Sequence, residues 1–298
     1  MDLIDLEQLS SRLADQIAAA APFVVSVQTG HRPRSGILYR PDVVLMSEQV
    51  LPEDVTNPTV RRGGATVAAT LAGRDNGSNV AVLKLATPLE GALPQAEPAK
   101  PRPGNLTLVV GADAEGAPTG RLAMVHAVGP AWHSMAGGRI DALIQLDSRL
   151  GADEGGPVLS LAGGLIGMST SGPRRRTIVI PTATIARVIE PLLADGRIPR
   201  GWLGVGLRPV AIPDQFRAET KCDSGLMVVS LAPNAPAEAA GILPGDIVLD
   251  IGGVPVDRPR ALAAAMGAEH IGQPVYLRLL RAGTLNTVSV TIAERPAR

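Results

Sequence analysis

Acidic side chains and a glycine-rich turn meet within residues 147–157, which makes this stretch the first place to look for chemistry. Asp147 opens it, Asp153 and Glu154 follow, and Gly155-Gly156-Pro157 leads into the apolar run 158–161. Three carboxylates could bind a hard cation, but the oxygen-rich loop pattern of such sites is missing. A carboxylate is also a poor nucleophile toward an amide unless it is activated. These residue types therefore indicate a defined turn without an obvious reaction of their own.

The composition excludes several classes of function. The chain has 298 residues, with 28 Lys+Arg against 28 Asp+Glu, so no strong field would draw it to nucleic acid or to an anionic membrane. Cys222 is the one cysteine, and the four histidines have no metal-ligand spacing, so we expect neither metal nor cofactor. Without a signal-peptide pattern or a spanning run, the sequence predicts a cytoplasmic protein, or a periplasmic one if a leader was removed.

Turn residues divide the chain into short segments. With 33 glycines, 26 prolines and few aromatic residues, we expect a mostly β protein with cores of small aliphatic side chains. Apolar residues at helical spacing predict an N-terminal helix over 1–20. Short apolar segments then predict one barrel over 21–86 and a second over 105–181, together forming a unit over 21–196. A proline-rich connector at 87–104 lies between the barrels, and a helix at 182–195 follows them.

The sequence pattern changes at Gly201, and the roughly one hundred residues that follow predict a separate domain over 201–298. Gly201-Trp202-Leu203-Gly204-Val205 opens it, and the blocks 235–242 and 244–247 follow. Together with Ser35-Gly36-Ile37 and Gln145-Leu146-Asp147, these motifs resemble the HtrA/DegP family. The resemblance covers about residues 21–292 and implies a chymotrypsin/trypsin-like double β-barrel followed by a C-terminal PDZ domain.

The resemblance also implies where the catalytic triad should lie. The family's histidine position holds Gln49, its aspartate position holds Asn79, and its nucleophilic serine position holds Glu154. The oxyanion loop would use backbone N–H groups at Ala152 and Glu154, with Asp153 between them. Glutamine cannot act as a base, and a carboxylate beside the loop would repel an oxyanion. We therefore expect a pseudoprotease that is not an enzyme, with the Glu154 carboxylate paired to Arg149 or Arg174.

The PDZ part is the expected working surface. Such domains add a peptide strand to a sheet edge and hold its terminal carboxylate on backbone N–H groups. The resemblance places the carboxylate loop at Trp202, Leu203, Gly204 and Val205, and the pairing strand at Val205 and Leu207. Leu262 and Met266 share a helix face and would wall the pocket for an apolar last residue, or belong to the domain core.

The sequence thus predicts a polypeptide-binding scaffold, adaptor or chaperone-like assembly factor. Its partners would be protein C-termini, with a client enzyme or an active HtrA-type relative as further possibilities, and it could form homo- or hetero-oligomers. The alternative is an active HtrA-type serine endopeptidase with displaced catalytic groups. A third interpretation is a structural subunit whose PDZ groove is filled internally.

Overall fold

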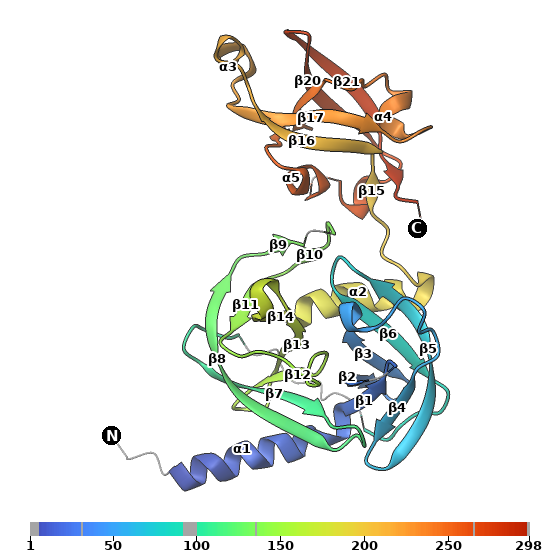
Figure 1. Cartoon of the computed structure of the whole chain (residues 1–298), viewed down its shortest axis with the longest axis vertical. Helices are drawn as coiled ribbons and strands as arrows, with labels where there is room; N and C mark the ends of the chain where they lie inside the picture. Colours follow the sequence, from blue (N-terminus) through green and yellow to red (C-terminus); the bar gives the residue numbers. More distant parts are fainter. Residues whose placement is uncertain (1–5, 31, 92–99, 135, 265, 297–298) are drawn as a thin grey trace. The chain divides into compact units, whose positions relative to one another are not determined.

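A computed structural model describes residues 6–30, 32–91, 100–134, 136–264 and 266–296 (Figure 1). The chain separates into two compact units, Met1–Ile198 and Pro199–Arg298. Each unit has its own apolar core. The predicted connector over 87–104 includes Pro94 and Pro98, which lie outside the described residues.

The first barrel is a closed sheet in the order β1-β2-β3-β6-β5-β4. Helix α1 (Leu6–Ala20) and a 3-10 turn, η1 (Ala21–Phe23), precede it. Val, Leu and Ile alternate with smaller side chains along its strands, and most of them are buried. The strands are β1 (Val24–Gln28), β2 (Pro33–Arg40), β3 (Val43–Ser47), β4 (Thr59–Arg62), β5 (Ala65–Asp75) and β6 (Val80–Leu85).

The second barrel is closed in the order β11-β14-β13-β12-β7-β8. Helix α2 (Thr182–Asp195) follows it and buries Ile185, Val188 and Leu192 against the barrels before ending at Gly196, whose φ is +71°. A two-stranded ribbon, β9 (Trp132–His133) and β10 (Arg139–Ile140), projects from it. The strands are β7 (Leu106–Ala112), β8 (Pro118–Gly129), β11 (Leu143–Leu146), β12 (Pro157–Ser160), β13 (Leu165–Ser171) and β14 (Thr177–Pro181).

The second unit is built on one antiparallel sheet in the order β16-β17-β18-β20-β21. The short strand β19 (Val254–Pro255) pairs with β18, and β15 (Gly201–Trp202) pairs with β22 (Ala293–Glu294). The main strands are β16 (Val205–Ala211), β17 (Ser224–Leu231), β18 (Ile247–Ile251), β20 (Pro274–Arg281) and β21 (Thr284–Thr291). Helices α3 (Asp214–Thr220), α4 (Pro236–Ala239) and α5 (Pro259–Ala264), and a 3-10 turn, η4 (Ala268–His270), connect them.

The predicted mostly β fold is confirmed: two closed six-stranded barrels precede a separate β-domain. Some element boundaries differ from the sequence expectations. β1 starts at Val24 because the residues before it form a 3-10 turn, and β4 was not predicted. The signal for β4 was present in Gly63-Gly64, a dipeptide that favours a tight hairpin turn and here joins β4 to β5.

A buried ion pair stabilises the sheet of the second unit. The Asp246 carboxylate is 2% exposed and accepts hydrogen bonds from Arg281 Nε and Nη2 at 2.7 and 2.6 Å and from the Leu243 N–H at 2.8 Å. Burial alone would raise the pKa of Asp246. The hydrogen bonds and the charge of Arg281 outweigh it, so that pKa lies below its usual value.

We expect Asp246→Asn to lower the free energy of unfolding of the second unit by about 1–3 kcal/mol, because Arg281 would lose its buried counter-charge. The folded pKa of Asp246 is lowered, so the wild-type contribution is complete above the unfolded value of about 3.9. It is lost as the pH falls through the folded pKa. Hydrogen exchange in β18 and β20 of the full chain measures both effects. Asp214→Asn, at a side chain 90% exposed, is the control, and equal effects of the two variants would contradict the expectation.

Candidate functional site

The structure brings Gln49, Asn79 and Glu154 together between the two barrels. Gln49 lies in the 3-10 turn η2 (Glu48–Val50) after β3, Asn79 precedes β6, and Glu154 precedes β12. The Gln49 backbone N–H donates to Asn79 Oδ1 at 2.9 Å, and Gln49 Nε2 donates to Glu154 Oε1. Their closeness does not test the assignment of these positions to a triad, which stays a prediction.

Local turns hold the two first-barrel members. Asn79 has a φ of +56°, a left-handed conformation that asparagine tolerates better than most residues. The preceding turn is fixed because the Ser78 N–H and Oγ donate to Asp75 Oδ2 at 2.8 and 2.7 Å. Glu48, beside Gln49, accepts from Arg74 Nε and Nη2 at 2.9 and 2.6 Å. Both turns are therefore anchored independently of the second barrel.

Thr170, on β13, links the three side chains. Its hydroxyl accepts from Gln49 Nε2 at 3.0 Å and from Asn79 Nδ2 at 2.5 Å, and it contacts Glu154 Oε1 at 3.4 Å. Ser47 Oγ lies 3.1 Å from the same hydroxyl. We call Gln49, Asn79, Glu154, Thr170 and Ser171 the Glu154 cluster.

Ser171 makes the closest contacts with the carboxylate from within the second barrel. Its backbone N–H donates to Glu154 Oε1 at 2.9 Å, and its hydroxyl donates to Glu154 Oε2 at 2.8 Å. The expected pairing of Glu154 with Arg149 or Arg174 is wrong: within the described parts of the chain, the partners of this carboxylate are all neutral. Glu154 is only 6% exposed, and a buried charge is tolerable when donors surround it in this way.

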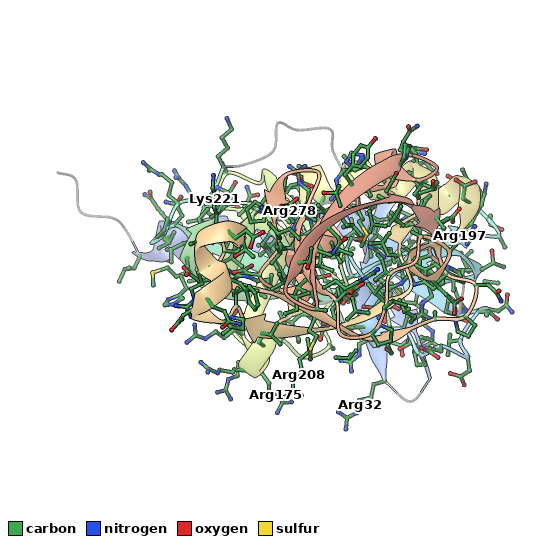
Figure 2. All side chains as sticks on the ribbon, turned by 90° about the horizontal axis from the view of Figure 1, so that it is seen from above. Arg32, Arg175, Arg197, Arg208, Lys221 and Arg278 are labelled. Carbon is green, nitrogen blue, oxygen red and sulfur yellow. The ribbon has the colours of Figure 1, made fainter. Side chains whose placement is uncertain are left out.

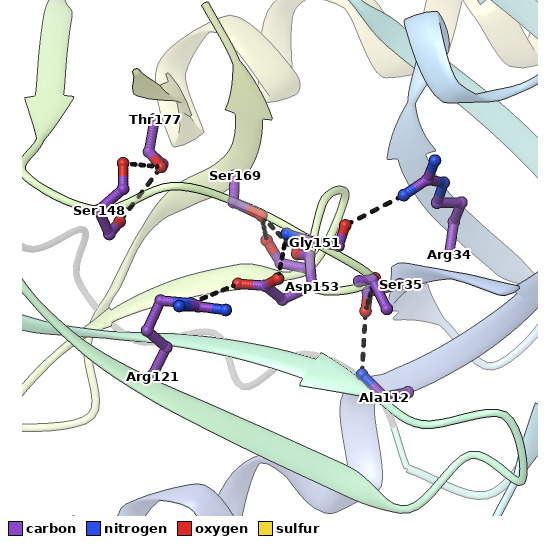
Figure 3. A network of polar contacts seen from close by, with 11 residues as sticks. Arg34, Ser35, Ala112, Arg121, Ser148, Gly151, Asp153, Ser169 and Thr177 are labelled. Carbon is purple, nitrogen blue, oxygen red and sulfur yellow. Dashed lines mark hydrogen bonds and ion pairs between the residues drawn. The ribbon is translucent and has the colours of Figure 1, made fainter. Parts of the chain in front are cut away.

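The loop before Glu154 is fixed by its own polar contacts (Figure 3). Asp153 Oδ1 accepts from the Gly151 N–H at 2.6 Å, and Asp153 Oδ2 accepts from Arg121 Nε at 3.1 Å. The Ala152 carbonyl accepts from the Ser35 N–H and Oγ at 2.9 and 2.8 Å. The Glu154 N–H points back toward the Gly151 carbonyl at 3.4 Å. In this conformation the predicted oxyanion donor at 154 is therefore directed into its own loop.

The Gly-Gly turn is required by close packing. Gly155 has a φ of +95°, and a Cβ there would lie 2.3 Å from the Ser35 carbonyl oxygen. A Cβ on Gly156 would lie 2.0 Å from the Val110 carbonyl oxygen. Neither neighbour is a flexible side-chain end, so larger residues would displace the loop and move Glu154.

One histidine outside the Glu154 cluster has a shifted pKa. His133, on β9, has a lowered pKa because it is partly buried and faces the charges of Arg139 and Arg187. Within the described ranges, no group of three or more His, Cys, Asp or Glu side chains could hold a metal ion.

No helix in those ranges is long and apolar enough to cross a membrane.

The predicted carboxylate loop of the second unit has a defined backbone. Gly204 has a φ of +75°, and a Cβ there would lie 2.2 Å from the Ala235 Cβ, so glycine is required. The Leu203 and Gly204 carbonyls accept from the Ala237 and Ala232 N–H groups at 3.0 and 2.8 Å. Because C=O and N–H point in opposite directions across a trans peptide, the Gly204 and Val205 N–H groups are turned away from these partners.

β16 lies at the end of the sheet order, so its far side is an edge. Val205, Leu207 and Met266 are partly buried and pack against the core of the unit, whereas Leu203 and Leu262 are core residues at 2% exposure. Trp202 is half-buried on β15, and a Cβ at Gly204 would lie 3.0 Å from its ring. Met266 lies beyond the end of α5 at Ala264, so the expectation that it shares a helix face with Leu262 is wrong. The assignment of the seven residues to a peptide groove stays a prediction.

Two family models match the chain in this order: a trypsin-like peptidase domain over residues 34–168 and a PDZ domain over residues 201–292. In the order of these two domains and along most of its length, the chain is similar to HtrA-type proteases. A curated relative from Rhizobium meliloti (strain 1021), named a probable periplasmic serine endoprotease DegP-like, is 29% identical over 278 residues. The match covers 89% of this chain and 55% of that protein. A relative of the same name from Halomonas elongata is 29% identical, covering 88% and 56%. The chain thus spans about half the length of the curated relatives it matches.

Solved structures agree with this assignment. The serine endoprotease from Yersinia pestis matches with a TM-score of 0.73 at 26% identity, covering 95% of this chain and 98% of that one. The HtrA-type protease AlgW with a decapeptide matches with a TM-score of 0.76, covering 96% and 99%. At 21% identity the AlgW match shows the fold alone.

Two sequence predictions are corrected by these names. Relatives named serine endoproteases contradict the prediction that the chain is not an enzyme, and with it the pseudoprotease interpretation. The prediction considered only the residue types at positions 49, 79 and 154, whereas the cluster also contains the Ser171 hydroxyl beside the Glu154 carboxylate. The cytoplasmic prediction is contradicted because the relatives are named periplasmic.

Sequence reasoning missed Ser171 and Thr170. Ser171 is 17 residues from Glu154, and only closure of the barrel places the end of β13 beside the loop. A serine at the end of an apolar strand carries no local signal for such a role.

We expect Glu154→Ala to lower the free energy of unfolding of the double barrel by about 1–3 kcal/mol, because the partly buried Ser171 N–H and hydroxyl would lose their acceptor. Denaturant unfolding, with hydrogen exchange in β13, measures this. Glu53→Ala, at an exposed site, should change it by less than about 0.5 kcal/mol. Equal stability of the two variants would contradict the importance of the cluster.

Proposed function

We propose that this HtrA-like protein binds polypeptides at their C-termini through its PDZ domain. The observation that carries the proposal is the backbone at Gly204 and Val205. The Leu203 and Gly204 carbonyls accept hydrogen bonds within the domain. The N–H groups of the same two peptide units, those of Gly204 and Val205, therefore face the other way. Backbone N–H groups clustered in a turn suit a carboxylate.

The adjoining edge supports a strand-addition mode. The Ala232 N–H donates to the Gly204 carbonyl, and Val205 is paired with Leu231. Bonded and non-bonded pairs alternate along an antiparallel ladder, so the Val205 N–H faces outward from β16 and β17. A peptide placed along β16 would continue the antiparallel sheet. Val205, Leu207 and Met266 are partly buried against the apolar core of the domain, and we expect them to favour an apolar last residue.

Free-acid peptides ending in an apolar residue should bind the full chain, and amidation of the same peptides should weaken binding at least about tenfold, since charge-assisted hydrogen bonds to the terminus would be lost. Isothermal titration calorimetry measures both affinities. A peptide ending in aspartate serves as the matched control for the apolar pocket. Equal affinities of acid and amide would contradict the proposed mode.

A second candidate function is favoured by one contact. We propose that the chain is an HtrA-type serine endopeptidase with displaced catalytic groups, in which Ser171 is the nucleophile and Glu154 its general base. The Ser171 hydroxyl already donates to Glu154 Oε2 at 2.8 Å. On attack, the Ser171 oxygen would bond to the amide carbon while its proton passes to Glu154. The carboxylic acid would then return that proton to the leaving amine as the C–N bond breaks. Catalysis also requires the loop to turn the Glu154 N–H away from Gly151, so that it can bind the oxyanion.

We expect slow casein turnover that a serine-directed phosphonate abolishes, with the label found on Ser171 by mass spectrometry. Ser171→Ala should remove both turnover and label, because the attacking hydroxyl is gone. Ser10→Ala, at an exposed site on α1, should leave both intact. No turnover, or a label on another serine, would overturn this assignment while leaving the PDZ proposal untouched.

A further inference from the structure

Four exposed arginines border the Glu154 cluster on two neighbouring loops. Arg149 lies in the loop before β12, and Arg174, Arg175 and Arg176 follow β13 only a few residues after Ser171. We call these four side chains the arginine rim. The two loops are tied together, since the Thr177 N–H and Oγ donate to the Ser148 carbonyl at 3.2 and 2.8 Å (Figure 3). Arg149 and Arg176 are the chain neighbours of this contact.

The rim carries positive charge that the surrounding acids do not neutralise. Asp153 and Glu154, on the same loops, are 8% and 6% exposed and are held inward by other donors. Asp147 accepts from the Met124 N–H at 2.8 Å. Across the described part of the chain, none of the four rim guanidinium groups has a hydrogen bond or ion pair. The whole chain has a net charge of zero, so this surplus is local.

The turn that carries the rim is held in an unfavourable conformation. Arg174 and Arg175 have φ values of +57° and +59°, which cost about 1–2 kcal/mol for each non-glycine residue. This tight turn keeps the arginines exposed, and Figure 2 shows the Arg175 side chain extending away from the ribbon. Each guanidinium group can bind a carboxylate in a bidentate manner.

We infer that the arginine rim binds an acidic segment of a polypeptide alongside the Glu154 cluster. Two observations favour a polypeptide over a nucleic acid. Residues 148–176 contain no aromatic side chain on which a base could stack, although single-strand binding depends on such platforms. The charge is also confined to one rim, whereas phosphate backbones are held by extended positive surfaces. The inference concerns the double barrel and rests neither on PDZ binding nor on hydrolysis at Ser171.

The test uses the full chain and a fluorescent Glu-rich peptide whose C-terminus is amidated, so that it offers no terminal carboxylate to the PDZ domain. Fluorescence anisotropy should show binding that is absent for the matched Gln-rich peptide. Binding should also disappear near 1 M salt, where the screening length falls to roughly 3 Å. Arg174→Gln/Arg175→Gln/Arg176→Gln should weaken it at least about tenfold, since three charge-assisted contacts would be lost.

The control variant Arg12→Gln/Lys100→Gln/Arg102→Gln also removes three positive charges, but from exposed sites elsewhere. It should change the affinity for the Glu-rich peptide less than about twofold. Thermal unfolding checks that each variant is folded. If the triple variant unfolds, Arg149→Gln/Arg176→Gln tests the rim without altering the left-handed residues. An equal loss of affinity in the rim and control variants would overturn the inference. So would binding of the Gln-rich peptide, or binding of a short RNA more tightly than the Glu-rich peptide.

Discussion

The buried Glu154 carboxylate is the polar interaction around which the candidate site between the two barrels is organised. Its partners come from both sides: Gln49 from the first barrel, and Thr170 and Ser171 from β13 of the second. A carboxylate shielded from water needs several donors to offset its lost hydration. The donors can be in place only when the turns at Gln49, Asn79 and Gly155 have their observed conformations. The placement of the donors around Glu154 therefore depends on the glycines, on the Asp75 turn and on the Arg74–Glu48 pair.

The same geometry changes how the residue types should be interpreted. Judged one position at a time, glutamine, asparagine and glutamate seem to remove the base and the nucleophile of a peptidase. In the folded chain they form a connected set of hydrogen bonds that includes the Ser171 hydroxyl. The relatives are named serine endoproteases, and the contact between Ser171 and Glu154 gives our endopeptidase proposal a physical basis. The inward-facing Glu154 N–H indicates which conformational change that proposal requires.

Much of the fold followed from local patterns, because short apolar strands, glycine turns and the motif around Trp202–Val205 each have a local physical cause. The closeness of Gln49, Asn79 and Glu154 was accessible only through the family resemblance, since they are separated by 30 and 105 residues from Gln49. The roles of Thr170 and Ser171 were not accessible, because barrel closure decides which residues of β13 meet the loop. The neutral partners of Glu154 were also missed. Arg149 and Arg174, near it in sequence, suggested ion pairs, but both side chains are exposed to solvent.

A double-mutant cycle between Gln49→Ala and Glu154→Ala in the full chain tests the central claim most directly, because these side chains belong to different barrels. The free energies of unfolding of the wild type, both single variants and the double variant give the coupling between the two side chains. If the Glu154 carboxylate joins the barrels, the coupling should be at least about 1 kcal/mol in favour of the wild-type pair. Additivity within about 0.3 kcal/mol would contradict the account.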